Sequence, residues 1–114
     1  MSGITTHVLD IARGRPAAGV PVTLEANSEG AGWQVANRQT TDTNGRLGNL
    51  LPGGFALTEG EYRLVFDVGA YFAACGIEGF YTEVVVSFVV RDAASDYHVP
   101  LLLSPYGYTT YRGS

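Results

Sequence analysis

The chain has 114 residues, which is enough for one hydrophobic core, and we expect a single domain over residues 1–114. Apolar residues make up 46% of the sequence and charged residues only 16%. That balance argues against a disordered chain and indicates that a partner covers part of the surface. Because the net charge is −4 and no basic run is present, we expect neither nucleic acid nor an anionic membrane surface as a partner.

Cysteine usage and the first residues indicate the cellular compartment. Cys75 is the only cysteine, so no intrachain disulfide can form, and a reducing compartment fits best. The start MSGITTHVLD has neither a basic n-region nor an apolar h-region, and no stretch is long enough to span a membrane. We therefore expect a cytoplasmic protein.

Apolar residues alternate with a period of two along most of the chain, interrupted by Gly, Pro and Asn, which predicts short antiparallel strands. In chain order the predicted strands are 4–11, 20–26, 33–40, 61–68, 81–90, 96–104 and 106–112. The segment DTNG (42–45) predicts a turn before Arg46 and Leu47. AYFAACG (70–76) ends on glycine and predicts one short helix. About eight regularly spaced strands predict a two-sheet sandwich.

The segment 96–104 is apolar on both of its predicted faces. Alternation directs its odd-numbered residues to the core and leaves an outward set of His98, Pro100, Leu102 and Ser104. An outward leucine beside a proline and a histidine suits a subunit interface, so we predict a closed homo-oligomer. Pro100 also lacks a ladder donor, which predicts an edge position or a bulge for this strand.

The two histidines, His7 and His98, each lie in a predicted strand between apolar neighbours. Histidines in such places commonly make one hydrogen bond in a core or an interface, and this interpretation stays open beside a catalytic one. Neither histidine has ligand spacing to Cys75 or to an acidic residue, so we expect no metal site.

Three further polar residues carry little signal by themselves. Arg46 follows a turn and Arg112 follows a Tyr/Thr-rich strand, where an arginine is usually solvated. Ser114 lacks the G-x-S-x-G elbow of a serine hydrolase. The residues alone therefore lead to an oligomeric β-sandwich with two unusually placed histidines.

Four stretches together resemble the 5-hydroxyisourate hydrolase family, also called the transthyretin-related proteins. They are ITTHVLDIARGRPAAGVPVTLE, TDTNGR, EYRLVFDVGAYFAACG and HVPLLLSPYGYTTYRGS. The resemblance runs from Ile4 to Ser114, and the terminal Tyr-Arg-Gly-Ser separates these enzymes from the hormone-carrying transthyretins. It implies an all-β, transthyretin-like sandwich of two four-stranded sheets with one short helix. It also implies a homotetramer, a dimer of dimers, with active sites where subunits meet across a central channel.

The resemblance also implies the site and the reaction. The implied catalytic residues are His7, Arg46, His98 and Ser114, and the implied substrate-binding residues are Tyr111, Arg112, Gly113, Leu102, Ser104, Pro105 and Tyr108. The implied reaction hydrolyses 5-hydroxyisourate to 2-oxo-4-hydroxy-4-carboxy-5-ureidoimidazoline in urate degradation, without a metal or an organic cofactor. Either histidine is suited to act as the base near pH 7, and an arginine is suited to hold the oxygen-rich substrate.

Two other functions stay open from the sequence. One is a transthyretin-like carrier of a small aromatic ligand in the tetramer channel, and the other is a structural sandwich that only mediates assembly. A carrier needs apolar walls rather than two histidines and an arginine that converge with a charged chain end. The α-carboxylate of Ser114 is expected to pair with Arg46 or Arg112.

Overall fold

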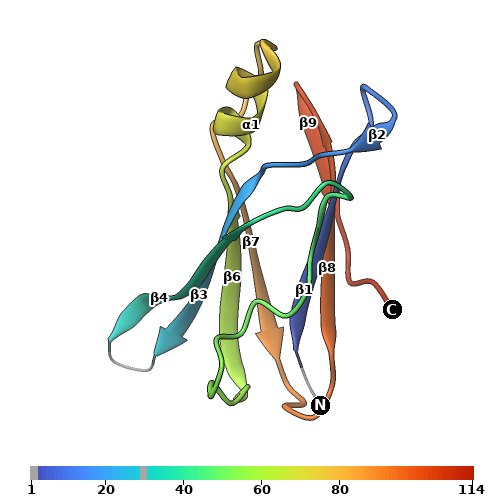
Figure 1. Ribbon diagram of the computed structural model, residues 1–114. Helices are drawn as coiled ribbons and strands as arrows, with labels where there is room; N and C mark the ends of the chain where they lie inside the picture. Colours follow the sequence, from blue (N-terminus) through green and yellow to red (C-terminus); the bar gives the residue numbers. More distant parts are fainter. Residues whose placement is uncertain (1–2, 29–30) are drawn as a thin grey trace.

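The computed structural model describes residues 3–28 and 31–114, which form two facing β-sheets with one helix at one end (Figure 1). The elements in chain order are β1 Ile4–Asp10, β2 Arg15–Pro16, β3 Pro21–Ser28, β4 Gly32–Thr40, β5 Arg46–Leu47, β6 Gly60–Phe66, α1 Val68–Cys75, β7 Val84–Val90, β8 Tyr97–Ser104 and β9 Gly107–Thr110. The prediction of a two-sheet sandwich with one short helix is confirmed.

The first sheet has the strand order β2-β1-β8-β9, and β5 also pairs with β1. It has five strands rather than the expected four, because β2 and β5 share one edge of β1. β5 pairs with Thr6–His7 and β2 with Leu9–Asp10. The opposite edge of β1 pairs with β8 along all seven of its residues, and this pair is parallel. The expectation of antiparallel strands throughout is therefore wrong for β1 and β8, which are joined by most of the chain.

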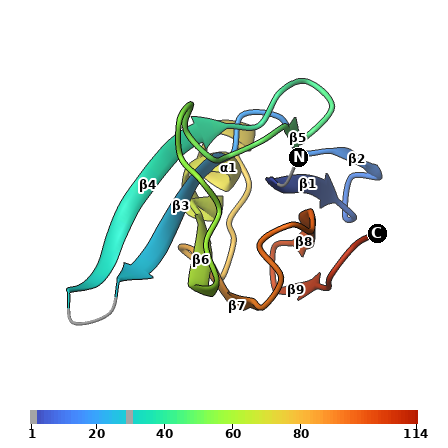
Figure 2. The ribbon, with the colours of Figure 1, turned by 90° about the horizontal axis from the view of Figure 1, so that it is seen from below.

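The second sheet has the strand order β4-β3-β6-β7, and all of its pairs are antiparallel. Viewed from below, it stands opposite the first sheet, and the β3–β4 hairpin extends beyond the sandwich (Figure 2). The hydrophobic core fills the space between the sheets. Its largest fully buried side chains are Ile4, Leu24, Leu50, Leu64, Phe66, Leu101 and Leu103.

The helix α1 begins earlier than predicted and has a defined cap at each end. The carboxylate of Asp67 accepts a 3.0 Å hydrogen bond from the amide of Ala70 at the first turn. Gly76 ends the helix at φ +69°, a left-handed conformation that favours glycine. The phenol of Tyr71, on the buried side, donates a 2.7 Å hydrogen bond to the carboxylate of Asp10 and so joins the helix to β1.

Pro100 does not lie on an edge strand, which corrects the prediction made from its missing N–H, since β8 runs between β1 and β9. The carbonyl groups of His98 and Pro100 accept hydrogen bonds from Gly113 N–H and from the hydroxyl of Thr110. The Pro100 nitrogen therefore faces the β9 side. There the ladder stops after the pair Leu101–Thr110 and resumes in the same register only at an isolated bridge, His98–Gly113. The missing donor thus falls in a gap of the ladder.

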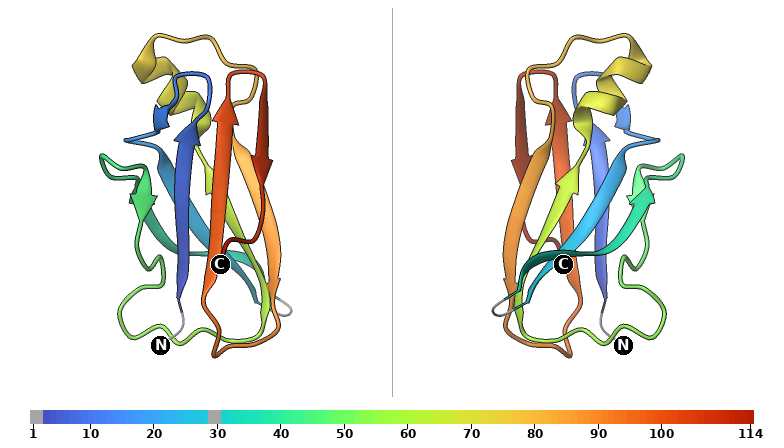
Figure 3. Two further views of the ribbon diagram at one scale, coloured as in Figure 1. Left: turned by 90° about the vertical axis from the view of Figure 1, so that its right-hand side faces the viewer. Right: turned by 90° about the vertical axis from the view of Figure 1, so that its left-hand side faces the viewer.

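The predicted strand 106–112 is shortened for the same reason, and the chain leaves the sheet after Thr110. The last residues then return toward the outer face of β8, as the left view of Figure 3 shows. No helix in the described part of the chain is long and apolar enough to cross a membrane.

Candidate active site

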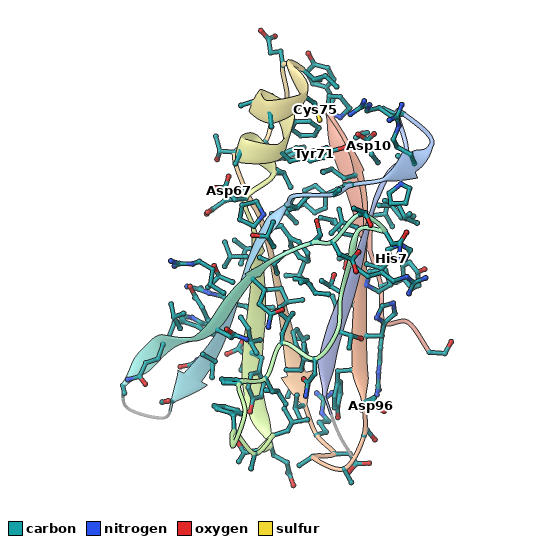
Figure 4. All side chains as sticks on the ribbon, in the orientation of Figure 1. His7, Asp10, Asp67, Tyr71, Cys75 and Asp96 are labelled. Carbon is teal, nitrogen blue, oxygen red and sulfur yellow. The ribbon has the colours of Figure 1, made fainter. Side chains whose placement is uncertain are left out.

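The outer face of the first sheet brings both histidines and Arg46 onto adjacent strands. His7 on β1 pairs with Arg46 on β5 at one side and with Pro100 on β8 at the other. His98 on β8 pairs with Thr5, two residues before His7 on the same face of β1. Figure 4 shows His7 on the side of this sheet that faces away from the second sheet. Strand register therefore groups three of the predicted site residues on one surface.

The imidazole of His7 is half-buried and is anchored by one ring nitrogen. His7 Nε2 lies 2.9 Å from the carbonyl oxygen of Asn44. A carbonyl oxygen only accepts hydrogen bonds, so Nε2 carries the proton and donates it. In the neutral ring Nδ1 is then the free nitrogen.

The turn that carries Asn44 also carries Arg46, and Asp42 organises it. Asp42 Oδ1 accepts hydrogen bonds from the amides of Asn44 at 2.8 Å and Arg46 at 3.0 Å. These two bonds, first that from Arg46, lower the pKa of the Asp42 carboxyl below its ordinary value. Gly45 has φ +73°, and a β-carbon there would collide with the carbonyl oxygen of Val8, so only glycine fits.

The environment of His98 favours its neutral form. Burial lowers the pKa of His98, and the positive charge of Arg46 and then the electrostatic interaction with His7 lower it further, while a hydrogen bond with Thr5 acts in the opposite direction. His98 Nδ1 lies 2.8 Å from the hydroxyl oxygen of Thr5, at hydrogen-bonding distance. The ring is therefore held at Nδ1 and is neutral near pH 7, the state that a general base needs.

A cavity of about 760 Å³ opens beside these residues. It is lined by Gly3, Thr5, Thr6, Asp42, Arg46, Leu47, Gly48, Asn49, Asp96, His98 and Ser114. Gly113 lies beside the site as well, because its amide donates a 2.8 Å hydrogen bond to the His98 carbonyl. The cavity therefore combines the cation of Arg46 and the neutral imidazole of His98 with the carboxyl groups of Asp42 and Asp96, the terminal residue Ser114 and several neutral hydrogen-bonding groups. The guanidinium and the neutral hydrogen-bonding groups suit a polar, oxygen-rich ligand.

Other predicted site residues lie apart from this cavity. His7 does not line it, although it pairs with Arg46. Tyr111 and Arg112 line a separate hollow between β7 and the β8–β9 edge. There the guanidinium of Arg112 stacks on the ring of Tyr97, 4.5 Å from its centroid, and donates to the carbonyl of Asp96 at 3.3 Å. The expected pairing of the Ser114 carboxylate with Arg46 or Arg112 is not among the salt bridges of the described residues.

The remaining four predicted residues lie toward the far end of β8. Leu102 is half-buried on the outward face. The hydroxyl of Ser104 donates a 2.9 Å hydrogen bond to the Gly107 carbonyl and so shapes the β8–β9 turn. The Pro105 carbonyl accepts a 2.7 Å bond from Phe80 N–H. Tyr108 packs edge-on against Tyr81, with ring centroids 5.2 Å apart.

Five polar residues that line the cavity were not predicted from the sequence. They are Thr5, Thr6, Asp42, Asn49 and Asp96. Asp42 had a usable signal, because an aspartate that opens a turn commonly accepts from the backbone two residues later. Thr5 had no such signal in the sequence, since its contact with His98 depends on the parallel pairing of β1 with β8. In residues 3–28 and 31–114, no group of three or more His, Cys, Asp or Glu side chains is arranged to hold a metal ion.

Comparison with known proteins gives one consistent family. The model of the HIUase/Transthyretin family matches residues 4–113. The 5-hydroxyisourate hydrolase of Caulobacter vibrioides is 46% identical over 118 residues, which cover 100% of both chains. The solved structure of Klebsiella pneumoniae 5-hydroxyisourate hydrolase is similar with a TM-score of 0.86 at 37% identity over 100% of each chain.

A carrier fold is also similar. Sea bream transthyretin, solved in complex with thyroxine, has a TM-score of 0.88 at 30% identity, covering 96% of this chain and 93% of that one. The resemblance drawn from the four sequence stretches is confirmed by these comparisons. The chain belongs to the HIUase/Transthyretin family.

Proposed function

We propose that the protein is a 5-hydroxyisourate hydrolase that acts in urate degradation, as one domain over residues 1–114. The observation that carries the proposal is the presence of Arg46 and His98 at one cavity, with the pKa of His98 lowered so that its ring is neutral near pH 7. The activity named for the relatives from Caulobacter vibrioides and Klebsiella pneumoniae supports the same conclusion.

The proposed reaction opens the six-membered ring of 5-hydroxyisourate at an amide bond. The oxygen of water adds to the amide carbonyl carbon while a neutral histidine accepts the proton that the water gives up. The tetrahedral intermediate then collapses, the ring C–N bond breaks, and the nitrogen leaves with a proton. The product is 2-oxo-4-hydroxy-4-carboxy-5-ureidoimidazoline. Substrate and water supply all of its atoms, so the balance requires no cofactor.

Three residues divide this chemistry among them. Arg46 presents a planar set of N–H donors that suits the carbonyl oxygens of the substrate and the oxyanion of the intermediate. His98 is suited to be the base because it is neutral and lines the cavity. His7 is next to Arg46 in the sheet, although it does not line the cavity, and its proposed role is to exchange a second proton with the leaving nitrogen.

We further propose that the enzyme is a homotetramer, a dimer of dimers, located in the cytoplasm. Several large apolar side chains are exposed, with Phe80 71% and Tyr106 69% accessible, and surfaces of this kind support association. Ser104 lies six residues beyond His98 on β8, roughly 20 Å away. A second subunit is therefore needed if Leu102, Ser104, Pro105 and Tyr108 contact the same substrate. The unpaired Cys75 suits a reducing compartment.

A carrier function is the second candidate, favoured by the similarity to a transthyretin that binds thyroxine. The ultraviolet decay of freshly generated 5-hydroxyisourate separates the two functions. With the protein far below the substrate concentration, an enzyme accelerates the decay through many turnovers, whereas a carrier leaves its rate unchanged. Decay at the spontaneous rate, with protein that is folded and assembled, would contradict the proposed hydrolase.

A further inference from the structure

One carboxylate oxygen of Asp42 binds two backbone amides of the turn that leads into Arg46. Asp42 Oδ1 accepts from the amide of Asn44 at 2.8 Å and from the amide of Arg46 at 3.0 Å. The Asp42 amide in turn donates a 3.0 Å bond to the Arg46 carbonyl, and Gly45 N–H donates to the Asp42 carbonyl at 2.9 Å. The backbone of residues 42–46 is therefore closed on itself around this side chain.

This closed turn fixes which way the Asn44 carbonyl points. The carbonyl lies 2.9 Å from His7 Nε2, and His7 is the cross-strand partner of Arg46. If the ring carried its proton on Nδ1 instead, a lone pair of Nε2 would face a lone pair of the carbonyl oxygen, which is repulsive. A hydrogen bond to one ring nitrogen of a histidine in this way decides the tautomer and the reactive atom.

We propose that Asp42 is a positioning residue of the hydrolytic site, which holds His7 as the Nε2–H tautomer through the Asn44 carbonyl and sets the position of Arg46 through its amide. The inference rests on the proposed function. It assigns Nδ1 as the atom of His7 that exchanges a proton with substrate or water. Asp42 itself does not exchange a proton, because the hydrogen bonds that it accepts keep its carboxyl ionised.

The carboxylate acts here through geometry, so its shape matters more than its charge. Asparagine retains an oxygen that accepts from the amide two residues later, and serine accepts there as well, although more weakly. Alanine retains neither. The series Asp42→Ala, Asp42→Asn and Asp42→Ser therefore separates the turn-forming role from the negative charge that Asp42 contributes near Arg46.

The first readout is the ¹⁵N spectrum of the protein labelled at histidine. The chain has only two histidines, so the His98→Asn variant assigns the signals of His7 without ambiguity. We expect one Nε2–H tautomer for His7 in the wild-type protein and a mixture of both tautomers in Asp42→Ala. Asp42→Asn and Asp42→Ser are expected to restore the single tautomer.

The second readout is steady-state hydrolysis of 5-hydroxyisourate. We expect kcat/KM of Asp42→Ala to fall by about tenfold to a hundredfold, the cost of small misplacements of a catalytic group. In Asp42→Ala we expect the displaced Arg46 to raise KM and the mixed His7 tautomers to lower kcat. In Asp42→Asn we expect both KM and kcat to return most of the way to their wild-type values. A merely structural role would leave the His7 tautomer unchanged in Asp42→Ala.

Asp67→Ala is the matched control, because Asp67 also accepts a backbone N–H through Oδ1, from Ala70 at 3.0 Å, but at the start of α1. Figure 4 shows Asp67 near the helix, far from His7. This variant is expected to retain the His7 tautomer and the activity. If Asp42→Asn is as impaired as Asp42→Ala, or if the His7 tautomer does not change in Asp42→Ala, the inference is wrong. The tautomer is measured without substrate, so an unchanged His7 tautomer in Asp42→Ala contradicts the role of Asp42, whereas a wild-type protein that fails to hydrolyse 5-hydroxyisourate contradicts the proposed function on which that role rests.

Discussion

Gly113 lies directly against the imidazole of His98. Its amide donates a 2.8 Å hydrogen bond to the His98 carbonyl, in the register of the β8–β9 ladder. A β-carbon on Gly113 would lie 2.5 Å from His98 Cδ2 and 3.3 Å from Pro100 Cγ. The backbone of the last residues thus forms one wall around the ring, at a distance that only glycine allows.

The first prediction follows from this contact. Gly113→Ala should displace either the ring of His98 or the terminal segment, and we expect kcat/KM to fall by roughly tenfold or more because catalytic geometry is lost. The matched control is Gly53→Ala, where an added β-carbon has no neighbour within 4 Å. Hydrolysis by the two purified proteins is compared. Equal activity would show that the wall formed by Gly113 does not constrain His98.

The second prediction concerns the pH dependence of turnover. Burial, then Arg46, then His7 lower the pKa of His98, so the ring stays neutral as the pH falls below about 6.5, the ordinary value for histidine. We expect kcat/KM to keep its plateau below that pH and to fall when the pH reaches the lowered pKa. In Arg46→Gln a positive neighbour is lost, so the pKa of His98 should rise. An NMR titration of His98 checks this without substrate, and a downward shift would contradict it.

The third prediction tests the base directly. His98→Asn keeps a hydrogen-bonding side chain of similar size but cannot accept a proton from water, and general acid–base help is worth roughly 10²–10⁴-fold in rate. We expect a loss of that order in kcat with an unchanged oligomeric state. His7→Asn should behave alike, and the double variant should lose little more than either single one if the two act as a unit. Wild-type turnover by a folded His98→Asn protein would exclude His98 as the base.

The fourth prediction concerns the fork geometry of Arg46. Arg46→Lys retains the charge but replaces a planar set of donors with a single ammonium group, so it should not restore activity. Arg15→Lys is the control, because Arg15 pairs with Asp10 on the same edge of β1 that Arg46 uses. Steady-state hydrolysis is measured for both variants. Full activity of Arg46→Lys would limit the role of Arg46 to long-range charge.

The fifth prediction tests the assembly. Leu102 is half-buried in the isolated chain, on the outward face of β8. If another subunit covers it, Leu102→Glu buries an unpaired charge and should dissociate the tetramer. Val35→Glu, at a side chain 57% exposed on β4, should leave the tetramer intact. Sedimentation velocity distinguishes these outcomes, and an intact tetramer of Leu102→Glu would show that this face is free.

A large part of the fold could be predicted from the sequence because the determinants are local. Alternation of apolar residues correctly assigns Tyr97, Val99, Leu101 and Leu103 on β8 to the core, all of which are buried. Pro100 of the predicted outward set is buried as well, because the terminal segment at Gly113 lies against it. The glycine that ends α1 and the DTNG turn before Arg46 are equally local signals, and both are confirmed. Each of these signals is contained in a short stretch of the sequence, so it can be recognised without knowledge of the tertiary structure.

Tertiary structure alone decided which residues of distant segments meet. The parallel pairing of β1 with β8 brings Thr5 to His98, and the shared edge of β1 brings Arg46 to His7. No period in the sequence encodes these partners, since each strand has two edges and its alternation is the same for either neighbour. The gap that Pro100 leaves in the ladder, bridged again at Gly113, likewise depends on which side of β8 faces β9. The residue types of the site could therefore be identified from the sequence. That these residues lie close together results from the packing of two whole sheets around one core.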